Sequence, residues 1–156
     1  MPVMTNSDVD HSSPITVADL HGRSGAELDR LFLDADAGSI PDGRTTGTAL
    51  VLTGTLATRP LAWIARHGAW QGKDFTPESH DLRNLLTPFG VRAIRAVVRT
   101  DVSLLDGRPC TVLDYSSTST VARWVRDEIR EVAPGVHLGM VFWAGRRLPL
   151  RFALSG

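Results

Sequence analysis

The chain has 156 residues, an apolar fraction of 42% and a formal net charge of zero. That length suits one domain, and the apolar fraction is too high for a disordered chain. Balanced charge offers no basic surface for a nucleic acid, and no apolar run approaches the about 20 residues that span a bilayer. The single cysteine, Cys110, excludes an internal disulfide and a multi-cysteine metal site.

We therefore expect a cytoplasmic bacterial protein with no nucleic-acid or membrane partner. A net charge near zero favours self-association, so a homodimer is an expectation as well. Residues 1–16 are rich in Ser, Asp, Asn and Thr and lack the apolar core of a signal peptide. They are predicted to form a disordered leader, and residues 17–156 a single barrel-like domain.

The first predicted element is a helix that begins after Ser24. Ser24 and Glu27 have the spacing of a capping box, in which each side chain accepts a hydrogen bond from the other residue's backbone amide. Gly38 suits the end of this helix. Its buried face would consist of Leu28, Leu31, Phe32 and Ala35.

The next segment mixes strand and helix signals. Residues 45–55 are rich in Thr, Val and Leu, which predicts a strand. Pro60 suits the first turn of a helix that would run through Trp70. The polar residues 79–87 predict one or two further helical turns.

From Gly90 the apolar residues alternate with polar ones, which predicts a strand over 92–99. Asp106-Gly107 is typical of a hairpin turn, and the return strand is predicted over 109–115.

Residues 118–132 are predicted to form a long helix, because apolar residues recur there at helical spacing. Pro134-Gly135 would end it, and strands are predicted over 136–143 and 148–154. Antiparallel hairpins with intervening helices indicate an α+β domain. Its sheet would be curved, or closed into a lipocalin-like β-barrel with flanking helices.

Lys73 is the only lysine among 17 basic residues. A lysine can act as a base with a shifted pKa, as a Schiff-base nucleophile or as a point charge. A GC-rich genome that nearly excludes lysine could also retain one by chance. We place Lys73 at a pocket mouth, where it would polarise a carbonyl oxygen, and no neighbour in the sequence supports a Schiff base.

Glu128 is the best-motivated carboxylate. On the predicted helix it shares an apolar stripe with Trp124 and Val132, and a carboxylate among apolar groups has a raised pKa or a partner. It is therefore a candidate acid or base, with a structural ion pair to an arginine of the sheet as the alternative. Asp127 is assigned to a solvated ladder of charged pairs on the same helix.

Two further residues are candidates for proton transfer. Tyr115 is the only tyrosine and ends a predicted strand, where its phenol could act as a general acid or lie at the rim of the core. His137 shares a strand face with Gly139, Val141 and Trp143, so it is a candidate base if that face lines a cavity, and a surface residue otherwise.

Aromatic residues suggest a pocket for a flat or greasy ligand. Apolar pockets with a few placed polar groups are typical of small-molecule sites. No dinucleotide, phosphate-loop, nucleophile-elbow or metal-ligand motif is present, so no cofactor and no metal are predicted. The predicted substrate-binding residues are Trp70, Trp124, Trp143, Met140 and Phe75.

The pattern Gly68-x-Trp70-x-Gly72-Lys73-x-Phe75 resembles small bacterial domains named for a G-x-W-x-G motif. Residues 135–140 resemble the C-terminal part of those domains, and residues 125–135 are similar to segments of uncharacterised actinobacterial proteins with lipocalin-like barrels. The resemblance implies a calycin-like barrel and carries no activity. The long predicted helix departs from this pattern, so a cone-shaped α+β barrel, as in polyketide-cyclase-like proteins, is the alternative fold.

These features predict a cofactor-independent enzyme that binds a hydrophobic, polyketide- or terpenoid-like molecule and promotes cyclisation, isomerisation or elimination. Glu128 or His137 would move a proton, and Lys73 or Tyr115 would polarise a carbonyl oxygen. A lipophilic-ligand carrier without catalysis is the alternative. A haem-binding barrel with His137 as the axial ligand is a weaker one.

Overall fold

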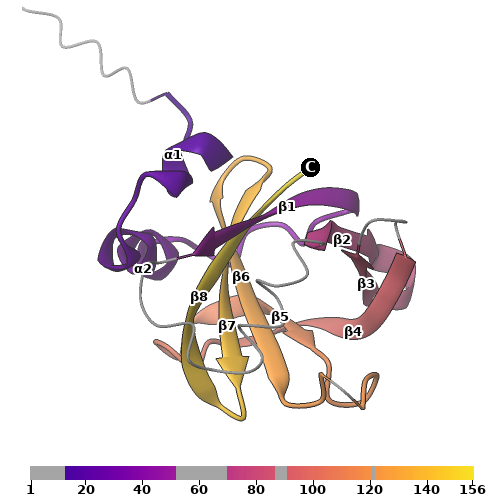
Figure 1. Cartoon of the computed structure of the whole chain (residues 1–156). Helices are drawn as coiled ribbons and strands as arrows, with labels where there is room; N and C mark the ends of the chain where they lie inside the picture. Colours follow the sequence, from indigo (N-terminus) through magenta and orange to yellow (C-terminus); the bar gives the residue numbers. More distant parts are fainter. Residues whose placement is uncertain (1–12, 52–69, 87–90, 121) are drawn as a thin grey trace, which may run out of the picture.

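Eight antiparallel strands form a closed barrel in the computed structural model, which describes residues 13–51, 70–86, 91–120 and 122–156. Side chains are described except at 51, 70–71, 85–86 and 91–93. Each strand pairs with its neighbours in the sequence, and the first strand closes the barrel against the last (Figure 1). The predicted α+β barrel is thus confirmed.

The strands are β1 (Gly43–Val51), β2 (Trp70–Thr76), β3 (Asp81–Leu86), β4 (Val91–Val102), β5 (Pro109–Asp114), β6 (Val125–Ala133), β7 (Val136–Trp143) and β8 (Arg146–Ser155). Two helices, α1 (Val17–His21) and α2 (Gly25–Asp34), precede the barrel, and a short 3-10 helix, η1 (Pro77–Ser79), joins β2 to β3. None of the described helices is long and apolar enough to cross a membrane.

The capping-box prediction at α2 is confirmed. The Ser24 hydroxyl accepts from the Glu27 amide, and the Glu27 carboxylate accepts from the Ser24 amide. The helix ends at Asp34, before the predicted end at Gly38. Helix α1, which was not predicted, has a second capping box between Thr16 and Asp19.

Strand alternation gives the barrel wall two different apolar faces. The inner face holds one core, which includes Phe75, Leu113, Ile129 and Phe152. The outer face of β7 and β8 holds a second core, in which α1 and α2 cover the sheet. Both helices lie on one side of the barrel (Figure 1). The second core includes Leu20, Leu28, Phe32, Leu138, Met140, Phe142 and Ala153.

A fully buried arginine ties α2 to the barrel. The Arg130 guanidinium donates two hydrogen bonds of 2.8 Å to the two carboxylate oxygens of Asp106. It also donates to the carbonyl oxygens of Phe32, Arg108 and Pro109, at 3.0, 3.2 and 3.2 Å. Its carbon Cζ lies 4.6 Å from the centre of the Phe32 ring. One side chain of β6 thus binds the end of α2, the turn before β5 and the first residue of β5.

The predicted helix over 118–132 is wrong, because residues 125–133 form β6. β6 pairs with both β5 and β7, and the four residues 127–130 in its middle are all buried. The turn at Pro134-Gly135, where Gly135 has φ of 73°, makes β6 and β7 a hairpin. Cross-strand pairing on both sides therefore overrides the apolar spacing that suggested a helix.

Two further predictions concern the chain between β1 and β4. The predicted helical turns over 79–87 are wrong, because η1 covers 77–79 and β3 follows from Asp81. The predicted helix from Pro60 lies outside the described residues, apart from its last residue, Trp70, which begins β2.

Candidate functional site

Four polar side chains meet inside the barrel wall. The Lys73 ammonium donates to the hydroxyl of Tyr115 at 2.7 Å, to Asn84 Oδ1 at 2.8 Å and to Asp127 Oδ2 at 3.1 Å. The Tyr115 hydroxyl donates to Asp127 Oδ2 at 3.1 Å and accepts from Asn84 Nδ2 at 3.1 Å. We call these four residues the lumen cluster. Every member is buried.

Each member of the lumen cluster comes from a different part of the barrel. Lys73 lies on β2, Asn84 on β3 and Asp127 on β6, and Tyr115 directly follows β5. Lys73 and Asp127 alternate with outward-facing neighbours, so they share the inner face with core residues of their own strands. Barrel closure, rather than sequence proximity, therefore assembles the cluster.

The backbone around Lys73 is held tightly against β1. The Thr45 hydroxyl donates to the Lys73 carbonyl at 2.9 Å and accepts from the Lys73 amide at 3.3 Å. Gly72 has φ of 149°, and a Cβ there would overlap the Thr45 carbonyl oxygen. Only glycine fits this approach of two strands, which fixes the start of the lysine side chain.

Burial sets the protonation of the cluster. Loss of solvation lowers the pKa of Lys73, and the Asp127 carboxylate opposes that shift. Burial raises the pKa of Tyr115 well above its ordinary value, and the charge of Asp127 raises it further. The phenol therefore keeps its proton and can donate a hydrogen bond at neutral pH. The Lys73 ammonium also lies 5.2 Å from the centre of the Phe152 ring, within reach of a cation–π interaction.

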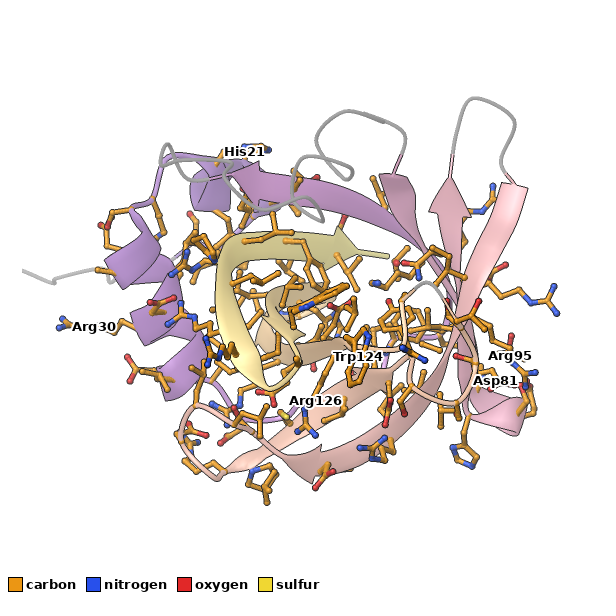
Figure 2. All side chains as sticks on the ribbon, turned by 60° about the horizontal axis from the view of Figure 1, so that its bottom comes forward. His21, Arg30, Asp81, Arg95, Trp124 and Arg126 are labelled. Atoms are coloured by element: carbon orange, nitrogen blue, oxygen red, sulfur yellow. The ribbon has the colours of Figure 1, made fainter. Side chains whose placement is uncertain are left out.

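A cavity of about 150 Å³ opens near the turn between β2 and β3. Its lining includes Phe75 and Val98 from the inner core, with His80 and Asp81 nearer the rim. Asp81 pairs with Arg95 on the side of the barrel away from α2 (Figure 2). Phe75 follows Lys73 by two residues on the same face of β2, a separation of roughly 7 Å. A cavity of about this size can hold one aromatic ring.

Glu128 lies on the outer face of the wall, away from the lumen cluster. Its carboxylate accepts from the Ser103 hydroxyl at 2.6 Å and the Leu104 amide at 2.9 Å, and it forms an ion pair of 2.9 Å with Arg126. The structure thus matches the alternative raised for Glu128, a buried ion pair with an arginine. Because residues 125–133 form a strand, Asp127 and Glu128 face opposite sides of the wall.

The structure places His137 apart from the lumen cluster. It shares its face of β7 with Gly139 and Val141, and its Nε2 lies 2.8 Å from the Ser39 carbonyl oxygen. Val141 pairs with Asp127, and His137 lies four residues further along β7, roughly 13 Å away. His137 therefore joins the segment before β1 to the barrel end.

The predicted substrate-binding residues are dispersed over the barrel. Phe75 lies in the inner core and lines the cavity, whereas Met140 is buried on the outer face under the helices. Trp124, which precedes β6 (Figure 2), is 51% exposed. The Arg123 Cζ lies 4.8 Å from the centre of the Trp124 ring. Trp143 is partly buried at the end of β7. The side chain of Trp70 lies outside the described part.

Sequence reasoning missed two members of the lumen cluster, Asn84 and Asp127. Both fall in segments that were predicted to be helical. The signal for Asp127 was present as the alternation of Val125, Asp127 and Ile129, which puts a carboxylate between two apolar residues on one strand face. No comparable signal marks Asn84.

Cys110 is buried in β5, where burial raises the pKa of its thiol to about 12. It is therefore an inert core residue at neutral pH. Among the residues that the structure describes, no three or more His, Cys, Asp or Glu side chains are grouped so that they could hold a metal ion.

Comparison with known proteins supports the fold and gives no information on function. No protein-family model matches the chain, and no curated protein matches it. A solved structure of a protein from Thermomonospora curvata has a similar fold, with a TM-score of 0.64 and 17% sequence identity. The similarity covers 85% of this chain and 87% of that one. At this identity the likeness shows the fold alone.

Proposed function

We propose that this protein is a cofactor-independent enzyme that binds a hydrophobic carbonyl compound inside the barrel. The proposed chemistry is removal of a proton from the carbon next to the carbonyl group. Such a step can begin a cyclisation, an isomerisation or an elimination, so it unites the reactions expected from the sequence. A polyketide- or terpenoid-like molecule is the substrate class that suits an aromatic and aliphatic lining.

One observation carries the proposal: a cation, a neutral hydroxyl and a carboxylate converge in a buried site. Lys73 Nζ lies 2.7 Å from the Tyr115 hydroxyl, and both lie 3.1 Å from Asp127 Oδ2. A carbonyl oxygen that takes the place of one of these contacts would receive hydrogen bonds from Lys73 and Tyr115. The negative charge that develops on that oxygen would then be stabilised by groups already in position.

Asp127 is the proposed base and Asn84 a positioning residue. Asp127 adjoins both proposed donors, so a bound carbonyl group would have its adjacent C–H bond near the carboxylate. The Asn84 amide donates to the Ile94 carbonyl at 3.0 Å and to Tyr115 at 3.1 Å, which fixes the phenol. Water is largely excluded from the site, which strengthens each of these electrostatic interactions.

The proposal is tested by proton exchange in a simple probe, β-tetralone, a flat aromatic ketone. In deuterated water, NMR follows the loss of the protons next to its carbonyl group. The wild-type protein is expected to accelerate this exchange, and Asp127→Asn and Tyr115→Phe to lower the acceleration by about 10² to 10⁴. Glu128→Gln is the matched comparison, since it changes the next residue on the opposite face of the wall.

Three results would contradict parts of the proposal. If Glu128→Gln abolished exchange while Asp127→Asn did not, the base would be assigned to the wrong residue. If β-tetralone bound without any acceleration, the non-catalytic carrier would be favoured. If the protein took up haem and the Soret band disappeared in His137→Ala, the haem-binding alternative would be favoured.

A further inference from the structure

We propose that Lys73 is a covalent carbonyl-binding site, at which an aldehyde or ketone condenses with the side-chain amine to form an imine. This inference rests on the proposed function, because it requires a carbonyl compound to reach the lumen cluster. It goes further in naming a bond between protein and substrate. No neighbour along the chain supports such a bond, whereas the barrel places three polar side chains around the Lys73 amine.

Imine formation needs an unprotonated amine, and the cluster provides a place for its proton. Asp127 Oδ2 lies 3.1 Å from Lys73 Nζ, so the carboxylate can take a proton from the ammonium directly. Loss of solvation in the buried site also lowers the pKa of Lys73. Loss of solvation thus favours the neutral amine, which is the nucleophile in Schiff-base chemistry, whereas the charge of Asp127 favours the ammonium until the proton is transferred.

The condensation also needs an acid beside the carbonyl oxygen. The Tyr115 hydroxyl lies 2.7 Å from Lys73 Nζ and is protonated at neutral pH, so it can donate to that oxygen. As the N–C bond forms, the carbonyl π bond opens and the oxygen takes a proton from Tyr115, and the Tyr115 phenolate then takes a proton from nitrogen. The resulting carbinolamine then loses its hydroxyl as water.

Protons balance in the second step as well. Asp127 gives the departing hydroxyl the proton that it took from the ammonium, and the nitrogen lone pair forms the C=N bond of an iminium ion beside the Asp127 carboxylate. The overall change is ammonium plus carbonyl to iminium, the protonated imine, plus water, with no oxidation or reduction. An imine lowers the barrier to removal of the adjacent proton, so the covalent step serves the proposed chemistry.

The composition of the chain makes the test specific. Lys73 is the only lysine, so the α-amine is the one other primary amine of the chain. The protein is incubated with naphthaldehyde and sodium cyanoborohydride, which reduces an imine to a stable secondary amine. Intact mass and peptide mapping then locate the adduct, and labelling of the α-amine serves as an internal control.

We expect naphthaldehyde to label Lys73 in the folded wild-type protein. Asp127→Asn and Tyr115→Phe should each slow this labelling, on the order of 100-fold, while labelling of the α-amine stays unchanged. Lys73→Arg keeps the positive charge and should abolish both the adduct and β-tetralone exchange. β-Tetralone should protect Lys73 of the wild-type protein from labelling, a readout that depends on no variant.

Two outcomes would overturn the inference. In the first, only the α-amine is labelled in the folded protein, although Lys73 is labelled after denaturation. If β-tetralone exchange persists in that case, the proposed function stands with Lys73 as a non-covalent cation. In the second, Lys73 is labelled in Asp127→Asn and in Tyr115→Phe at the wild-type rate, and circular dichroism shows that both variants are folded. Lys73 would then be an ordinary amine without acid–base assistance.

Discussion

Asp106→Asn removes the carboxylate that neutralises the buried guanidinium of Arg130. The native pair has two hydrogen bonds of 2.8 Å, and Arg130 is fully buried whereas the Asp106 side chain is 17% exposed. An asparagine can accept one of these hydrogen bonds, but it directs its NH₂ group at a cation. The variant therefore leaves a buried charge without a counter-ion.

The magnitude follows from the shift in the carboxylate pKa. Hydrogen bonds from Arg130 lower the pKa of Asp106 from 3.8 to about 2. A shift of this size corresponds to about 2 kcal/mol. Removing one partner of a buried pair typically costs about 3–5 kcal/mol, and partial exposure of Asp106 reduces that figure. We therefore expect a loss of about 2–3 kcal/mol and a fall in Tm of roughly 4–12 °C.

The loss should depend on pH in a defined direction. The folded-state pKa of Asp106 is depressed, so its contribution is present above the unfolded value of 3.8 and is lost as pH falls toward about 2. The difference in stability between wild type and Asp106→Asn should therefore be full near pH 7. It should shrink steadily as pH falls below about 4.

Urea unfolding followed by circular dichroism, repeated from pH 7 down to the acid limit of the fold, measures this difference. Asp36→Asn is the matched control, because Asp36 is 95% exposed and pairs with Arg108 on the surface. An exposed pair contributes little, so no measurable change is expected there. Equal stability of Asp106→Asn and wild type at pH 7 would refute the reasoning, as would a difference that does not vary with pH.

Three other variants test the packing and the lumen cluster. Gly139→Ala should cost about 1–3 kcal/mol in urea unfolding, because the added Cβ would overlap the Phe152 ring. Gly22→Ala, where the added Cβ meets open space, should be neutral or slightly stabilising, and equal effects of the two substitutions would contradict the packing argument. Lys73→Met should cost about 3–5 kcal/mol in urea unfolding, because it leaves the buried Asp127 carboxylate without its cation. Adding Asp127→Leu should restore most of that stability, and a double variant no more stable than Lys73→Met would contradict the ion-pair argument. Tyr115→Phe should cost about 1–3 kcal/mol, because Asn84 and Lys73 lose a shared acceptor, and unchanged stability would mean that water replaces the hydroxyl.

The chain's local signals predict hairpins better than they predict the site. Asp106-Gly107 and the run from Val136 to Trp143 carry turn and strand signals within a few residues, and both predictions are confirmed. The pairing of Lys73 with Tyr115 spans 42 residues and depends on closure of the barrel. Lys73 and Tyr115 stand out in the sequence because each is the only residue of its type, but their contact could not be predicted from local pattern.

A single error in periodicity explains the misplaced carboxylate. Over residues 125–132 the apolar spacing fits a helix, and on a helix Glu128 faces the core while Asp127 faces water. On a strand Asp127 faces the lumen and Glu128 faces the outer side, because neighbouring side chains point to opposite faces. The choice between these patterns is decided by hydrogen bonds to β5 and β7, which come from other parts of the chain. The strand thus brings Asp127, and not Glu128, to the lumen cluster.

Closure of the barrel between β1 and β8 has a consequence for synthesis on the ribosome. These strands pair residues as far apart as Thr46 and Ser155, so the ring cannot close until β8 has emerged. Until then β1 and β7 each present an unpaired edge, and such edges can pair with other chains. A nascent chain that stalls before β8 should therefore aggregate readily and bind chaperones.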